Sequence, residues 1–177
     1  MKRLIPLILT AVAVTASAAY AAEAGGQGKS PAQFCKAELA TLGETNFKSL
    51  YSPGGSGANA MGKCVSKHAR AAAANRTNAA KACKAEMAMP EAQFRATHGD
   101  KSFAEFYGKN RNDRNAYGKC VSSKAQTAGA QQEATLMKAA KACKAERAAD
   151  RAAFTAKYGG KAASAFGKCV SSKNKTQ

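Results

Sequence analysis

The sequence predicts an all-α fold of three disulfide-stapled helical repeats, joined by alanine-rich helical linkers into an elongated array. Three observations lead to this prediction. Six cysteines recur in two alternating motifs. Alanine, the strongest helix former, fills the sequence between them. No segment has the alternating β-branched pattern of a strand.

The first motif is Cys-Lys-Ala-Glu, the second is Gly-Lys-Cys-Val-Ser, and each occurs three times. Their first residues are Cys35, Cys83 and Cys143 for the first motif, and Gly62, Gly118 and Gly167 for the second. Between them lies an aromatic pair four residues apart, a spacing that puts both rings on one helix face. These pairs are Phe47 and Tyr51, Phe103 and Tyr107, and Phe154 and Tyr158. The pattern predicts repeat 1 at 30–74, repeat 2 at 75–131 with an insertion at about 90–101, and repeat 3 at 132–177.

Each repeat is expected to hold three helices. The helix with the first motif should end at Gly43, Pro90 and Asp150, since proline suits the first turn of a new helix and aspartate its N-cap. A short helix then carries the aromatic pair. A third helix begins near the second motif and runs toward the next repeat, and residues 75–78 and 127–129 are its expected breaks.

Six cysteines in an exported chain predict disulfides. Repeat symmetry favours Cys35–Cys64, Cys83–Cys120 and Cys143–Cys169. The rival pairing joins Cys64 to Cys83 and Cys120 to Cys143 across the linkers. On a continuous helix those cysteines would stand roughly 28 and 34 Å apart, whereas a bridge needs Cα atoms within about 7 Å. The rival pairing therefore requires a sharp hairpin in each linker.

The N-terminus has the parts of a secretory signal peptide at 1–21. Lys2 and Arg3 precede an apolar stretch that ends in Ala19-Tyr20-Ala21, an A-x-A cleavage site. The alternative is an uncleaved membrane anchor, which the interrupting Pro6 and the many alanines disfavour. We predict cleavage after residue 21, a flexible segment at 22–29, no membrane span after cleavage, and an extracellular or cell-surface location.

The second and third repeats contain Ala-Tyr-Gly-Lys-Cys-Val-Ser at 116–122 and Ala-Phe-Gly-Lys-Cys-Val-Ser at 165–171. These motifs resemble a repeat of uncharacterised secreted proteins of actinomycete-type bacteria. The resemblance covers nearly all of the chain after the leader, although Met61 replaces the aromatic residue in repeat 1. It implies secretion and repetition, and it implies no chemistry.

Residue types that perform catalysis are scarce. His68 and His98 have no counterpart in the third repeat and are expected to be solvated helix residues. The repeated Glu38, Glu86 and Glu146 are expected to form structural ion pairs. No C-x-x-C motif and no Cys/His zinc spacing occur, so we predict no metal site. We also predict no catalytic residue, no cofactor and no small-molecule substrate. The protein is predicted not to be an enzyme.

The chain is strongly basic, with 28 Lys and Arg against 11 Asp and Glu and a net charge of +17. A lysine adjoins each of the six cysteines, and in every repeat a further lysine follows the second cysteine within four residues. These lysines form the predicted anion-binding set: Lys36, Lys63, Lys67, Lys84, Lys119, Lys124, Lys144, Lys168 and Lys173. We expect a binding or structural protein whose partner is an anionic cell-wall polymer, an acidic glycan or extracellular nucleic acid. The alternative is an extracellular protein–protein interaction or envelope module whose charge serves only solubility.

Overall fold

A computed structural model describes residues 29–54, 56–108, 114–159 and 162–175 of the chain. The predicted signal peptide at 1–21 and nearly all of the predicted flexible segment lie outside the described residues. Within them the fold is all-α, as predicted. The helices are α1 (Pro31–Leu42), α2 (Glu44–Tyr51), α3 (Ala60–Met87), α4 (Glu91–Thr97), α5 (Phe103–Tyr107), α6 (Ala116–Ala149), α7 (Arg151–Tyr158) and α8 (Ala162–Lys175).

The helix ends follow local sequence signals. Ser30 caps α1 by accepting a hydrogen bond from the backbone N–H of Gln33, whose side chain in turn accepts from the backbone N–H of Ser30. Gly43 ends α1 at φ 77°, in the left-handed region that favours glycine. Asp150 ends α6 and caps α7, because its carboxylate accepts from the backbone N–H of Ala153. The predicted ends of the first-motif helices at Gly43 and Asp150 are thus confirmed.

The expected breaks inside the linkers are wrong. Residues 75–78 lie within the 28-residue α3, and 127–129 lie within the 34-residue α6. One of these polar residues, Asn75, has a partner on the other long helix. Asn75 and Gln132 exchange two amide hydrogen bonds of 3.0 and 3.1 Å where α3 packs on α6. The boundaries predicted for repeats 1, 2 and 3 therefore fall inside continuous helices.

The three predicted disulfides are present. Cys35–Cys64, Cys83–Cys120 and Cys143–Cys169 have Cα–Cα distances of 5.9, 6.0 and 6.0 Å. Each joins the helix of the first motif to the helix of the second. The rival pairing is excluded, because Cys64 and Cys83 stand at opposite ends of the continuous α3.

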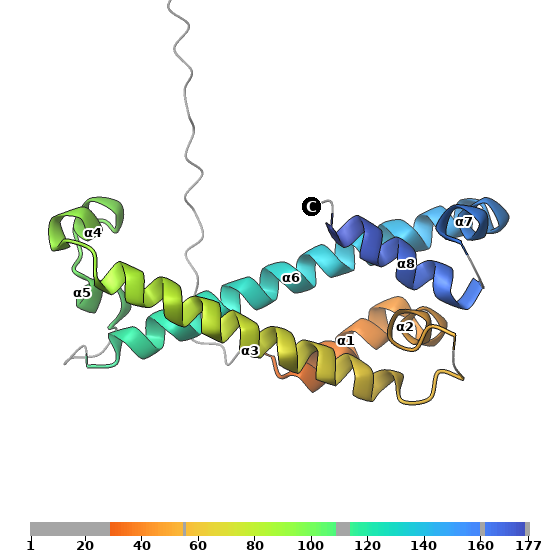
Figure 1. Cartoon of the computed structure of the whole chain (residues 1–177), viewed down its shortest axis with the longest axis horizontal. Helices are drawn as coiled ribbons and strands as arrows, with labels where there is room; N and C mark the ends of the chain where they lie inside the picture. The colour runs from red at the N-terminus through yellow and green to blue at the C-terminus, as the bar shows by residue number, and fades with distance from the viewer. Residues whose placement is uncertain (1–28, 55, 109–113, 160–161, 176–177) are drawn as a thin grey trace, which may run out of the picture.

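The two long helices run in opposite directions and cross, so the chain folds back on itself (Figure 1). Helices α4 and α5 of repeat 2 lie at one end of the crossed pair. The short helices of repeats 1 and 3 lie together at the other end, where α2 packs on α8. Elongation of the whole array stays a prediction, but repeats 1 and 3 are in direct contact.

The buried hydrophobic clusters follow this arrangement of the repeats. Leu42 of repeat 1 belongs to the same buried cluster as Leu136, Phe154, Phe166 and Val170 of repeat 3. Repeat 2 has a separate cluster around its own disulfide. Among the described residues, repeats 1 and 3 therefore share one core cluster, whereas repeat 2 has its own.

Candidate anion-binding surface and the polar clusters at the disulfides

Each disulfide lies beside a glutamate that accepts a hydrogen bond from a tyrosine. Tyr51 donates to Glu38 at 2.5 Å and Tyr107 to Glu86 at 2.9 Å. In repeat 3 the Tyr158 hydroxyl lies 3.1 and 3.2 Å from the two carboxylate oxygens of Glu146. The same contact therefore recurs in all three repeats. It links the helix of the first motif to the helix of the aromatic pair.

A cationic side chain completes two of these clusters. Lys124 lies 2.8 Å from Glu86 and Lys173 lies 3.2 Å from Glu146. Both lysines stand four residues after the second cysteine of their repeat. The expectation that the repeated glutamates form ion pairs is confirmed for these two.

His68 occupies the equivalent position in repeat 1, and its interpretation as a solvated helix residue is wrong. Its Nε2 lies 2.9 Å from Glu38, whose side chain is 0% exposed, while the His68 side chain is 17% exposed. Its ring also stacks on Phe34. The signal was present in the sequence, because Cys64 precedes His68 by the same four residues that separate the later cysteines from their lysines.

Burial and hydrogen bonding shift the acidities of these groups. Burial, followed by the hydrogen bond to Glu38, raises the pKa of Tyr51 well above its usual value. Burial and Glu86 raise the pKa of Tyr107 in the same way. Both tyrosines therefore stay protonated at neutral pH and act as hydrogen-bond donors. In repeat 3 the hydrogen bond from Lys157, with further bonds from Lys173 and Tyr158, lowers the pKa of Glu146 to about 2.

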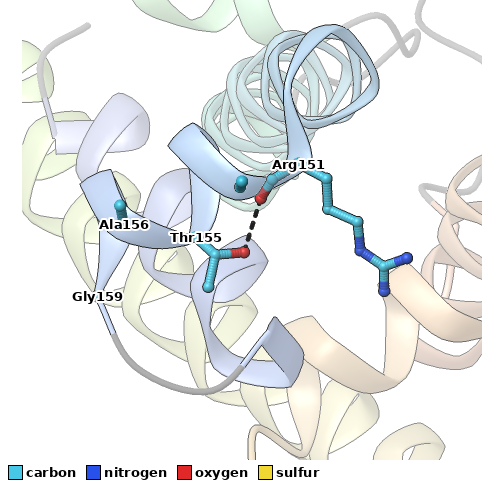
Figure 2. A pocket seen from close by; sticks show the side chains of 5 residues that line it. Arg151, Thr155, Ala156 and Gly159 are labelled. Carbon is cyan, nitrogen blue, oxygen red and sulfur yellow. Dashed lines mark hydrogen bonds between the residues drawn. The ribbon is translucent and has the colours of Figure 1, made fainter.

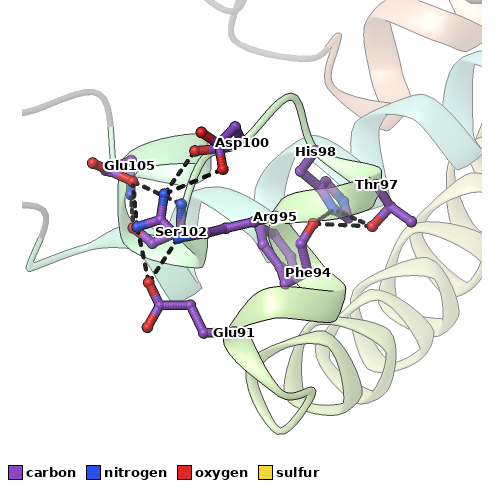
Figure 3. A network of polar contacts seen from close by, with 8 residues as sticks. All are labelled: Glu91, Phe94, Arg95, Thr97, His98, Asp100, Ser102 and Glu105. Atoms are coloured by element: carbon purple, nitrogen blue, oxygen red, sulfur yellow. Dashed lines mark hydrogen bonds and ion pairs between the residues drawn. The ribbon is translucent and has the colours of Figure 1, made fainter.

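Repeat 2 carries an additional polar network on its insertion (Figure 3). Arg95 pairs with Glu91 at 2.8 Å and with Glu105 at 3.4 Å, which ties α4 to α5. His98 stacks on Phe94 with ring centroids 3.8 Å apart, so it too is packed rather than solvated. The network is exposed and internally paired, which is typical of a structural role.

Two open depressions lie near the junction of α6 and α7. The first, about 630 Å³, lies along α7 and is lined by Arg151, Thr155, Gly159 and two alanines (Figure 2). Its Thr155 hydroxyl donates to the Arg151 carbonyl. Of the described residues that line it, Arg151 alone has an ionisable side chain. The second, about 420 Å³, is lined by residues 42–46 together with Arg147 and Arg151.

Among the residues that the structure describes, one group of potential metal ligands lies close together. The Cys35 and Cys64 sulfurs and a ring nitrogen of His68 lie within 4.8 Å of one another. Both sulfurs are joined in the disulfide, so they do not offer the thiolates that zinc binding requires.

Several lysines of the predicted anion-binding set are used internally. Besides Lys124 and Lys173, Lys168 donates to the Gly159 carbonyl at 3.0 Å, and Lys63 lies 3.4 Å from the Ser52 hydroxyl. The others are placed as follows: Lys67 lies over the Tyr51 ring, Lys119 is half-buried, and Lys36, Lys84 and Lys144 are exposed. The structure therefore does not gather all nine lysines into free clusters at the disulfides.

The long helix α3 instead carries an exposed basic face. Separations of 4, 7 and 11 residues return to one side of a helix, and residues at these spacings on α3 are Lys63, Lys67, Arg70, Lys81 and Lys84, all exposed. The one acidic residue of α3, Glu86, is paired with Lys124 of α6. On α6 itself, the exposed Lys138, Lys141 and Lys144 follow one another at three-residue spacing.

None of the helices among the described residues is both long enough and apolar enough to cross a membrane. No protein-family model matches the chain. Searches of curated proteins and of solved structures give no match either.

Proposed function

We propose that this protein is a secreted, non-catalytic binding protein that holds anionic extracellular polymers on the exposed basic faces of its long helices. Cell-wall polymers, acidic glycans and extracellular nucleic acid share the required chemistry, a row of negative charges along a flexible chain. The signal peptide predicted at 1–21 and the three disulfides support an extracellular location.

The basic face of α3 carries this proposal. Lys67, Arg70 and Lys84 are exposed, and none forms an ion pair with another described residue. Since α3 has 28 residues, it extends about 42 Å. A polyanion laid along it meets several cations, and each neutralised charge releases a counterion.

The test compares two variants that remove equal charge. The first exchanges four residues of the α3 face for glutamine: Lys67, Arg70, Lys81 and Lys84. The matched control exchanges four exposed basic residues from elsewhere in the chain: Lys29, Lys101, Arg151 and Lys175. Fluorescence anisotropy with a labelled single-stranded oligonucleotide, with heparin as competitor, measures the dissociation constants of the oxidised, leaderless protein.

For the wild type we expect binding that weakens roughly 100-fold between about 50 and 300 mM salt, with little sequence preference. The α3 variant should lose most of this binding and show a shallower salt dependence. Equal losses in both variants would mean that net charge alone attracts the polymer. Failure of the wild type to bind at low salt would reject the proposal and favour the protein–protein interaction module.

A further inference from the structure

Repeat 2 leaves open a surface that repeat 3 buries. Aligned on the second motif, Phe166 and Gly167 of α8 correspond to Tyr117 and Gly118 at the start of α6. Phe166 is 0% exposed, whereas Tyr117 is 41% exposed. The same position of the repeat is therefore covered in one case and uncovered in the other.

In repeat 3 the cover is α2 of repeat 1. A Cβ added to Gly167 would lie 2.9 Å from the backbone carbonyl oxygen of Ser49. Leu50, the next residue of α2, packs against the core that contains Phe166. Glycine is thus required at 167 because the backbone of α2 lies directly against it.

In repeat 2 the matching glycine has no close neighbour among the residues that the structure describes. A Cβ added to Gly118 would meet nothing within 4 Å. Helix α5 is the counterpart of α2, and its Phe106, which aligns with Leu50, is 39% exposed. The exposed large hydrophobic side chains among the described residues all belong to repeat 2: Met87, Met89, Phe106 and Tyr117.

We propose that a second copy of this chain covers this surface, with α5 of one copy docking on the first turns of α6 of the other. The docking repeats between two chains the contact that α2 makes on α8 within one chain. A second copy is the occupant because repeat 2 carries both halves of that contact, the covering helix and the glycine-containing face. When two copies are related by a twofold axis, each copy docks its α5 on the partner and receives the α5 of the partner on its own α6. The assembly is then closed as a dimer.

The charge of the protein sets the conditions for dimerisation. Two strongly basic copies repel each other, so added salt should strengthen their association by screening that repulsion. Polyanion binding should weaken with salt. The proposed dimer does not depend on the proposed polyanion binding. Because salt should strengthen the dimer and weaken polyanion binding, measurements at different salt concentrations test the two independently.

Sedimentation velocity of the oxidised, leaderless protein at about 0.3 M salt tests the dimer. Gly118→Leu places a side chain where the fold has open space but the partner helix must approach, so we expect the dimer dissociation constant to rise at least tenfold. The melting temperature should be no lower than that of the wild type, because leucine is a better helix former than glycine. Phe106→Gln should weaken the dimer from the other side. The control is Ala130→Leu, an exposed position farther along α6, which should leave association unchanged.

Mixing the two variants gives the sharpest outcome. Neither variant alone has an intact α5–α6 contact in its dimer, but a mixed dimer keeps one, between α5 of Gly118→Leu and α6 of Phe106→Gln. Recovery of association on mixing supports the proposed geometry. A wild type that stays monomeric up to about 1 mM would overturn the proposal, as would a Gly118→Leu variant that dimerises like the wild type.

Discussion

Replacing His68 by alanine should destabilise repeat 1, because it removes a partner of the fully buried Glu38. The Glu38 carboxylate has two close partners, the Tyr51 hydroxyl at 2.5 Å and the His68 ring at 2.9 Å. Breaking a buried pair by removing one partner costs about 3–5 kcal/mol. Since the His68 side chain is 17% exposed, water can partly replace it, and we expect a loss of about 2–3 kcal/mol in the free energy of unfolding. For a chain of this length that lowers the melting temperature by about 5–10 °C.

Replacing His68 by lysine provides the comparison. Repeats 2 and 3 already carry Lys124 and Lys173 at this position, within ion-pair distance of their glutamates. We therefore expect His68→Lys to remain within about 1 kcal/mol of the wild type in urea unfolding. If alanine and lysine at position 68 were equally destabilising, packing of the imidazole would be its role and the reasoning about Glu38 would be wrong.

Three further predictions concern individual polar side chains. The pKa values of Tyr51 and Tyr107 are raised in the fold. The two protonated tyrosines therefore contribute their full stabilisation below pH 10, and this stabilisation is lost as the pH rises above 10. A titration followed by absorbance should show both tyrosines ionising only as the protein unfolds in alkali. The lowered pKa of Glu146, about 2 against a reference of 4.5, stabilises the fold above about pH 4.5, and this contribution is lost as the pH falls toward 2. Glu146→Gln should therefore flatten the dependence of the melting temperature on pH in that window. Asn75→Ala should cost about 0.5–1.5 kcal/mol in urea unfolding, because it removes the amide hydrogen bonds between the buried Asn75 and Gln132, whose exposed side chain can bond to water instead. A double-mutant cycle with Gln132→Ala that shows no coupling would contradict this.

The disulfides and the helix ends could be predicted because their causes are local or follow from chain geometry. Gly43 and Asp150 act through their own backbone and side chain. The pairing of Cys35 with Cys64 follows once the linkers are helical, because a helix holds Cys64 away from Cys83. Each conclusion needed only the residues of one repeat and its linker.

The continuity of α3 and the role of His68 depend on contacts between distant residues. Asn75 looks like a helix break when its neighbours in sequence are considered alone, and its partner Gln132 lies 57 residues away. His68 is 30 residues from Glu38, and only its alignment with Lys124 and Lys173 indicates the contact. Single-sequence patterns do not contain such pairings unless a repeat supplies them.

The crossing of α3 and α6 determines which surfaces remain available. In a straight array each repeat would expose the face around its Gly-Lys-Cys-Val-Ser motif. Folding the chain back at repeat 2 brings repeats 1 and 3 together, and α2 then covers the face of α8. That contact covers the face at Gly167, whereas no described residue lies within 4 Å of a Cβ added at Gly118. The basic face of α3 is carried by a different set of residues, so dimerisation at repeat 2 would leave Lys67 and Arg70 accessible. A dimer would then present two such faces to one polyanion, and the linked sites would bind more tightly than one through effective concentration. The Gly118→Leu variant should accordingly bind a long polyanion more weakly than the wild type, while both should bind a short oligonucleotide that spans a single helix equally well.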